Sequence, residues 1–191
     1  MPQLAEKPFV TLEQYLQAEE LSTEKHEYCN GVVVAMAGGT MAHARVVTNL
    51  SGILFAQLRG RPCRPFNEAQ RIVVRETGLW TYPDLSVICG APQRAEGDRH
   101  AATNPKVIFE VLSESTAGYD QGEKFDHYAT IPSLEVYVLV DSRRENVVLN
   151  TRAEGASWLR RVYGAGANFR IEAIDVELSV AEIYEGWAEL L

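Results

Sequence analysis

The sequence has few cysteines, no long apolar run, and no apolar stretch in its first ten residues of the kind that a signal peptide contains. Three cysteines occur in 191 residues, with no C-x-x-C spacing: Cys29, Cys63 and Cys89. We expect reduced thiols in a cytoplasmic protein, although the sequence alone leaves a disulfide open. No apolar run approaches the ~20 residues that span a bilayer. Glu6 and Lys7 stand where a signal peptide would be apolar, so secretion and membrane insertion are not expected.

An overall basic charge is also missing, because the net charge is −8 at pH 7. The acids gather at the two ends, which leaves fourteen acids and sixteen bases in residues 31–171. That middle part holds the arginine clusters: Arg59, Arg61, Arg64, Arg71 and Arg75; Arg143 and Arg144; Arg152, Arg160 and Arg161. Arginine suits phosphate contact, but a solvated surface with ion pairs explains each cluster equally well. The charge pattern permits a polyanionic substrate without requiring one.

The order of predicted elements is typical of an α/β (α+β) fold in one domain over residues 1–191. Helices are expected at 12–20, capped by Thr11, at 41–59, capped by Thr40, at 115–130, capped by Ser115 or Thr116, and near 180–185. Strands are expected at 71–75, 79–89, 106–112, 135–140, 146–151, 157–163 and 169–171, with a hairpin over 27–36 at Asn30-Gly31 and an irregular loop over 90–105. These elements predict a mixed β-sheet core flanked by helices, with an N-terminal helix and hairpin and C-terminal antiparallel strands.

Glu110 is the most informative residue, because it interrupts the apolar strand 107–112. Alternation places Val107, Phe109 and Val111 on one face and Glu110 on the other, and both faces are apolar. The strand should therefore be central and covered on both sides. A buried carboxylate there needs a cation, which can be a lysine, an arginine or a metal ion.

Asp84 supplies a second carboxylate at the start of the apolar run 85–89, directly after Pro83. A Pro-Asp pair alone is common in turns. Neighbouring strands lie only ~4.8 Å apart, however, so Asp84 and Glu110 on adjacent strands can share one divalent ion. Mg²⁺ typically binds one or two carboxylates, several waters and substrate phosphate.

Lys124 is the third candidate, on the helix that follows the Glu110 strand. Asp120, Lys124 and Tyr128 fall on one helical face. One interpretation is a surface ion pair between Asp120 and Lys124. The other is an ammonium that projects over the sheet, where it would orient or deprotonate the attacking water, or stabilise charge on phosphorus.

The combination of these motifs resembles the Uma-type restriction endonuclease family of the PD-(D/E)XK nuclease superfamily, which is abundant in bacteria. The resemblance covers most of residues 11–141, on these segments: Glu27–Gly31, His43, Tyr82-Pro83-Asp84, Phe109–Thr116, Asp120–Lys124, Tyr128 and Glu135–Asp141. It implies a restriction-endonuclease-like fold and metal-dependent hydrolysis of DNA phosphodiesters. Two departures are Glu114, where the family commonly has proline, and Val136-Tyr137-Val138, which replaces a more aromatic pair.

The resemblance also implies roles for individual residues. Asp84 and Glu110 match the metal-binding acids, with Mg²⁺ as the expected ion and Mn²⁺ as a substitute. The usual lysine position of the superfamily is Leu112 here, which points to Lys124 instead. His43 and Glu27 are further catalytic candidates, and Asp120 is another. As rival interpretations, His43 is an ordinary helix histidine, and Glu110 belongs to a simple ion pair.

The predicted function is therefore a Mg²⁺-dependent endodeoxyribonuclease that acts on DNA, expected as a homodimer on analogy with enzymes that cut both strands. Arg94, Arg99 and His100 are predicted to contact the substrate backbone, with the arginines of 59–75 extending that surface. Two rivals remain: a catalytically silent nucleic-acid or protein interaction module with the same fold, and a metal-dependent hydrolase of RNA or nucleotides.

Overall fold

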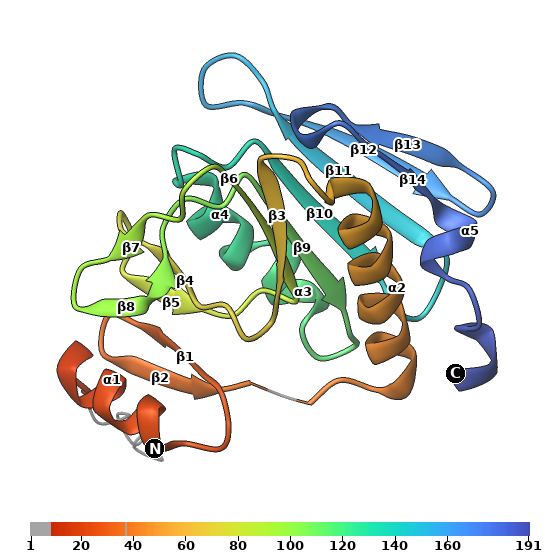
Figure 1. The fold of residues 1–191 in the computed structure, drawn as a ribbon. Coiled ribbons are helices and arrows are strands. Elements are labelled where there is room, and N and C mark those ends of the chain that lie inside the picture. Colours follow the sequence, from red (N-terminus) through yellow and green to blue (C-terminus); the bar gives the residue numbers. More distant parts are fainter. Residues whose placement is uncertain (1–8, 37) are drawn as a thin grey trace.

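Two six-stranded sheets form the framework of the protein (Figure 1). The computed structural model describes residues 9–36 and 38–191. The first sheet has the order β2-β1-β5-β4-β8-β7: β1 (His26–Cys29), β2 (Val32–Ala35), β4 (Ile72–Val74), β5 (Leu79–Thr81), β7 (Arg94–Ala95) and β8 (Asp98–Ala102). The second has the order β12-β11-β10-β9-β6-β3: β3 (Cys63–Asn67), β6 (Leu85–Cys89), β9 (Val107–Leu112), β10 (Val136–Asp141), β11 (Asn146–Arg152) and β12 (Trp158–Gly164). A hairpin of β13 (Asn168–Ile171) and β14 (Val176–Ser179) completes the strands.

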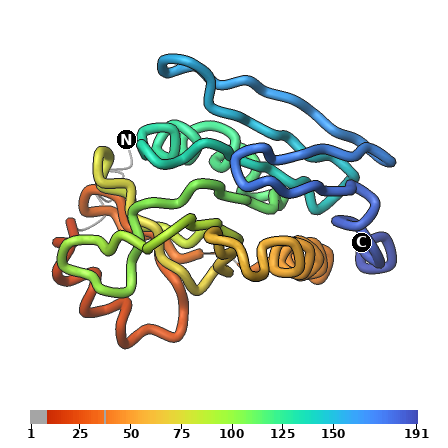
Figure 2. The backbone as a smooth tube through the Cα atoms, turned by 45° about the horizontal axis from the view of Figure 1, so that its top comes forward, coloured from red at the N-terminus to blue at the C-terminus, as the bar shows by residue number. Residues whose placement is uncertain are grey.

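Both faces of the second sheet are covered, as the apolar pattern of its central strands predicts. One face packs against α2 (Met41–Leu58), the β13–β14 hairpin and α5 (Val180–Ile183). The other packs against α4 (Glu123–Ala129) and against β4 and β5 of the first sheet. In the tube view, α2 is seen nearly end-on below the strands of the second sheet, and the first sheet lies at the left (Figure 2). Strand β9 is parallel to β10 and antiparallel to β6, which confirms the predicted mixed sheet.

The N-terminal helix and hairpin form as predicted. Helix α1 (Leu12–Leu21) begins with a capping box, in which Thr11 and Gln14 satisfy each other's backbone N–H groups. Asn30 and Gly31 adopt positive φ angles of 46° and 93° in the turn between β1 and β2. That pair of angles is the reason Asn-Gly is favoured in two-residue hairpins.

Three predicted elements differ from the structure: two are divided into shorter elements, and one contains a hairpin that was not expected. The expected strand 79–89 is two strands in different sheets, β5 and β6, because Pro83 cannot continue a ladder. The expected helix 115–130 is divided at Gly122 into α3 (Ala117–Gln121) and α4. The expected loop 90–105 contains the short hairpin β7–β8. Strand β3 was not predicted at all, since Arg64 and Pro65 obscure its apolar pattern.

The prediction of reduced thiols is wrong for two of the three cysteines. Cys63 and Cys89 form a disulfide between β3 and β6, whereas Cys29 is a free thiol. In the adjacent residue pair of these two strands, the N–H of Gly90 donates to the carbonyl of Pro62 (2.9 Å). Cys63 and Cys89 therefore occupy a non-hydrogen-bonded position, where cross-strand side chains lie closest. The sequence could not show this pairing without β3.

None of the helices in the described part of the chain is both long and apolar enough to cross a membrane.

Candidate active site

Glu110 lies in the interior of the second sheet, on β9 between β6 and β10. Its neighbours Ile108 and Leu112 pack on the α4 side of the sheet, and Phe109 packs on the α2 side. The Glu110 side chain is therefore directed toward α4, as strand alternation predicts. Its Oε1 accepts a hydrogen bond from the hydroxyl of Tyr128 (2.9 Å). The prediction of a buried carboxylate on a covered central strand is confirmed.

Lys124 forms ion pairs with three carboxylates. Its Nζ lies 2.9 Å from Glu27, 2.9 Å from Glu110 and 3.6 Å from Asp120. The Lys124 side chain is 5% exposed. The interpretation of a surface ion pair between Asp120 and Lys124 is therefore wrong, because the pair is buried against the sheet. The periodicity argument survives the break at Gly122, since Asp120, Lys124 and Tyr128 are all buried.

Asp84 stands opposite Glu110, because the register pairs Leu85 on β6 with Phe109 on β9. The backbone N–H of Asp84 donates to Glu110 Oε2 (3.3 Å). In return, the backbone N–H of Val111 donates to Asp84 Oδ2 (2.7 Å). These reciprocal bonds hold both carboxylates at one end of the β6–β9 pair. Asp84 is thus joined to Glu110 by hydrogen bonds, and Lys124 contacts the same pair through Glu110 (2.9 Å).

His43 joins this group from the first turn of α2. Its Nε2 lies 3.4 Å from Asp84 Oδ2. Thr40 caps the helix by accepting from the backbone N–H of His43 (3.2 Å), which fixes the position of that turn. Burial alone would lower the pKa of His43, but the hydrogen bond and charge of Asp84 outweigh burial, and the pKa is raised. His43 therefore carries a proton more readily than a free imidazole does.

Glu27 reaches the same place from the first sheet. It is on β1, and its Oε1 accepts from the hydroxyl of Thr81, the last residue of β5. Thr81 is fully buried. Thr81 and Tyr128 thus hold the two carboxylates that flank Lys124. No sequence signal marks Thr81, whereas Tyr128 could have been assigned this role from its place on the Lys124 face.

Carboxylates outnumber cations in this cluster. Glu27, Asp84, Glu110 and Asp120 surround one ammonium group and one histidine. Burial raises the pKa of Glu110 to about 8, against the opposing effect of Lys124. Burial lowers the pKa of Lys124, but its carboxylate partners prevail and raise that pKa well above the ordinary value. The cluster accordingly keeps Lys124 charged and has excess negative charge, which a bound cation would balance.

The donors present match the needs of a magnesium ion. Within residues 9–36 and 38–191, no group of three or more His, Cys, Asp and Glu side chains forms a complete metal-ligand set. Two carboxylates from adjacent strands, Asp84 and Glu110, are nevertheless the number that Mg²⁺ commonly takes from protein, with water and phosphate filling its other positions. The oxygen chemistry of these donors also suits Mn²⁺.

The positively charged residues of the predicted substrate loop lie outside this cluster. Arg99 bonds to the ring of His100 (3.1 Å), and the carbonyl of Arg94 accepts from Arg75 (3.3 Å). Over the described ranges, no hydrogen bond or ion pair links them to the five site candidates. Arg71 is committed to an ion pair with Asp98, so structural pairing accounts for it.

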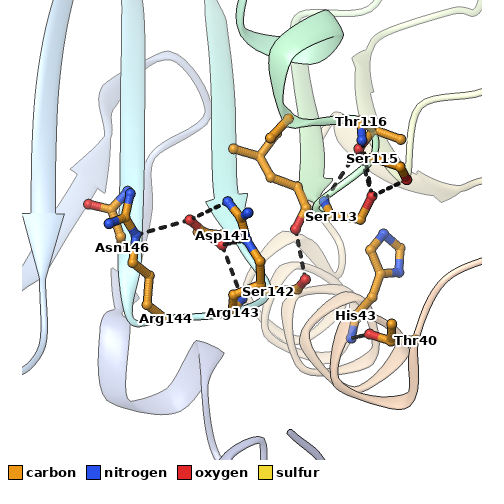
Figure 3. Close-up of polar contacts among 12 residues, drawn as sticks. Thr40, His43, Ser113, Ser115, Thr116, Asp141, Ser142, Arg143, Arg144 and Asn146 are labelled. Atoms are coloured by element: carbon orange, nitrogen blue, oxygen red, sulfur yellow. Dashed lines mark hydrogen bonds and ion pairs between the residues drawn. The ribbon is translucent and has the colours of Figure 1, made fainter.

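A second polar cluster lies along the same edge of the sheet (Figure 3). Asp141, at the end of β10, is clamped by Arg143 (2.8 Å) and Arg144 (3.1 Å). Nearer to His43, the hydroxyl of Ser113 bonds to the hydroxyls of Ser115 and Thr116 in the turn after β9. Figure 3 shows His43 facing this turn, away from Asp141. The arginine clamp is therefore a structural ion-pair network beside the site.

Together, the mixed sheet and the helices that cover it form a restriction-endonuclease-like fold. The fold resembles that of a solved structure titled a putative nuclease belonging to DUF820, from Anabaena variabilis, with a TM-score of 0.74 and 18% identity over 95% of this chain and 99% of that one. The predicted fold class is confirmed.

The chain belongs to the Uma2 family, described as "Putative restriction endonuclease", whose model matches residues 12–181. It is 36% identical to the uncharacterized protein slr1290 of Synechocystis sp. over 181 residues, which are 95% of this chain and 94% of that protein. It is also 36% identical to the uncharacterized protein sll1609 of the same organism over 156 residues, which are 82% and 88% of the two chains. The family predicted from the motifs is confirmed.

Proposed function

We propose that the protein is a metal-dependent endonuclease that hydrolyses phosphodiester bonds of DNA in the cytoplasm, with Asp84 and Glu110 as metal ligands. The observation that carries this proposal is the meeting of Asp84, Glu110 and Lys124 at one end of β6 and β9. A buried cluster with more carboxylates than cations is costly without a function that needs it. Membership of a family described as "Putative restriction endonuclease" supports the same activity.

The metal ion, when bound, would supply charge stabilisation for the phosphate and a more acidic water. Lys124 acts as a hydrogen-bond donor in this proposal, because its raised pKa keeps it as an ammonium. It would orient the attacking water and stabilise negative charge on the phosphate oxygens. Glu27 and Asp120 hold that ammonium in place from either side. His43, bonded to Asp84, would fix the orientation of that carboxylate.

The first test is cleavage of DNA by the purified protein. We expect nicking or linearisation of supercoiled plasmid in Mg²⁺ or Mn²⁺, no reaction in EDTA, and a loss of roughly 10³-fold in Asp84→Asn. Asn keeps the shape of Asp84 but removes its charge, so the variant isolates the ligand role. A matched control is Asp126→Asn on α4, outside the cluster, which should cut like the wild type.

The same assay separates the rival functions. A protein that binds Mn²⁺ but leaves plasmid, oligonucleotides and RNA intact would be the interaction module. Cleavage of RNA or of nucleotides, with plasmid untouched, would indicate the other hydrolase. A homodimer is proposed as the form that cuts both strands, and sedimentation of the active protein measures it.

Divalent ions should also stabilise the folded protein, because a ligand that binds only the native state shifts the unfolding equilibrium. At a hundredfold excess over the dissociation constant the gain is about 2.7 kcal/mol. We expect the melting temperature to rise in millimolar Mg²⁺ or Mn²⁺, and to stay unchanged in Asp84→Asn. A wild-type melting temperature that is indifferent to both ions would contradict a formed metal site.

A further inference from the structure

A groove runs between α2 and the edge strand β3, beginning beside the candidate active site. Two adjoining hollows make it up, of about 690 and 330 Å³. Both are lined by Phe55 and Pro65, so they are continuous. The first hollow also reaches Leu85, the residue after Asp84. The groove therefore extends from a proposed metal ligand toward the far end of α2, whose eighteen residues span about 27 Å.

The charge along this groove is opposite to that of the whole protein. Residues 28–67, which include α2 and β3, contain four arginines and neither aspartate nor glutamate. Three of these arginines line the second hollow: Arg59, Arg61 and Arg64. Arg61 also pairs with Asp175 (3.4 Å), and Glu68 at the site end pairs with Lys25 (3.5 Å). Arg59 and Arg64 thus form an exposed positive end to the groove in a chain of net charge −8.

An exposed aromatic ring lies in the middle of the groove. Phe55 is 62% exposed and lines both hollows. An aromatic face next to arginines is the combination that binds single-stranded nucleic acid, because unpaired bases stack on the ring and phosphates meet the cations. Bases within a duplex are not available for such stacking.

The edge of β3 disfavours a paired β-strand as the occupant. Val87, the cross-strand partner of Pro65, directs its carbonyl toward β9, where it accepts from the N–H of Lys106 (2.8 Å). Pro65 therefore faces the open edge, and it has no N–H to donate there.

We propose that this groove binds a single strand of the nucleic acid on which the site acts, with Phe55 stacking on a base and Arg59 and Arg64 contacting phosphates. The proposal rests on the nuclease function above and adds a preference for an unpaired strand beside the cleavage position. The strand would leave the site at Leu85 and follow α2 toward Arg59.

Gly52 allows a charge test that leaves the fold untouched. It lies in the groove on α2, and a Cβ built there meets no atom within 4 Å. Gly52→Glu and Gly52→Gln have the same shape and differ in charge alone. Binding of the full-length protein to a fluorescein-labelled single-stranded DNA oligonucleotide, in EDTA, is measured by anisotropy. We expect about tenfold weaker binding for Gly52→Glu than for Gly52→Gln, and weaker binding in Phe55→Ala.

The double variant Arg59→Ala/Arg64→Ala should lower the dependence of log affinity on log salt by about 1.4, at ~0.7 for each phosphate contact to a single strand. Arg160→Ala/Arg161→Ala on β12 is the matched control and should leave binding unchanged. Equal affinity of the two Gly52 variants for the oligonucleotide would overturn the proposal that the groove binds a single strand. A duplex bound more tightly than the single strand, with no effect of Phe55→Ala, would also overturn it.

Plasmid cleavage, run on the same variants, separates this inference from the proposed function. If the wild type cuts DNA but the groove variants bind the oligonucleotide normally, the groove proposal fails and the nuclease stands. If the wild type cuts no DNA, but Gly52→Glu binds the oligonucleotide more weakly than Gly52→Gln does, the groove proposal stands and the nuclease proposal fails.

Discussion

Replacement of Glu110 by glutamine is expected to abolish metal-dependent cleavage in a protein that remains folded. Glutamine keeps the volume of Glu110, and its amide oxygen can still accept from Tyr128 and Lys124. Its NH2 group takes the place of Oε2, so only the bond from the N–H of Asp84 is lost. It removes the negative charge that a divalent ion needs. We expect a loss of roughly 10³-fold in the cleavage rate, with a circular dichroism spectrum and cooperative unfolding like those of the wild type.

A pH dependence should accompany this loss. Burial raises the pKa of Glu110 to about 8, so the carboxylate form is less favoured near neutral pH than it is for a free glutamate. Metal binding requires the carboxylate, and affinity for Mg²⁺ should therefore rise as pH increases through that pKa. Calorimetry in buffers of different ionisation enthalpy should detect proton release near pH 7. Full cleavage activity in Glu110→Gln, or metal binding without proton release, would refute this account.

The largest effect on stability is expected for Lys124→Met. The methionine fills a similar space but leaves Glu27, Glu110 and Asp120 without their shared cation. Breaking a buried ion pair by removing one partner costs ~3–5 kcal/mol. Urea unfolding at pH 8 should show a loss of that size, which becomes smaller at pH 5 because the carboxylates take up protons.

The control for this variant is Lys106→Met. Lys106 pairs with Glu135 at the surface (2.8 Å), and an exposed pair contributes at most ~1 kcal/mol. Similar stability losses in the two lysine variants would show that the buried cluster has no special dependence on Lys124.

Strand alternation and helical periodicity were enough to predict the centre of the site. The alternation in 107–112 fixed the face of Glu110, and the spacing of Asp120, Lys124 and Tyr128 placed the lysine on the same side. Both arguments use short-range geometry that survives tertiary packing, even across the helix break at Gly122. The catalytic roles of these residues stay predictions for the experiments above.

Other parts of the structure depend on contacts that no local pattern encodes. The contact between Glu27 and Lys124 joins residues far apart in the chain and depends on the packing of the first sheet against the second. Thr81 meets Glu27 because β1 and β5 pair as neighbours in the first sheet. The pairing of Cys63 with Cys89 requires the register of β3 against β6. Strand β3 itself is held at the sheet edge by packing, because its sequence contains a proline and an arginine.

Glu27 and Thr81 belong to one sheet, whereas Asp84 and Glu110 belong to the other. This division has a consequence for the protein during its biosynthesis. The ribosome must release the chain as far as Tyr128 before Lys124 can meet its partners. The acids on both sheets repel one another until that ammonium arrives, so α4, the last of these elements along the chain, offsets part of their charge. Partly synthesised chains should therefore lack the complete cluster, and on the proposed function they would not cleave DNA before synthesis has passed Lys124.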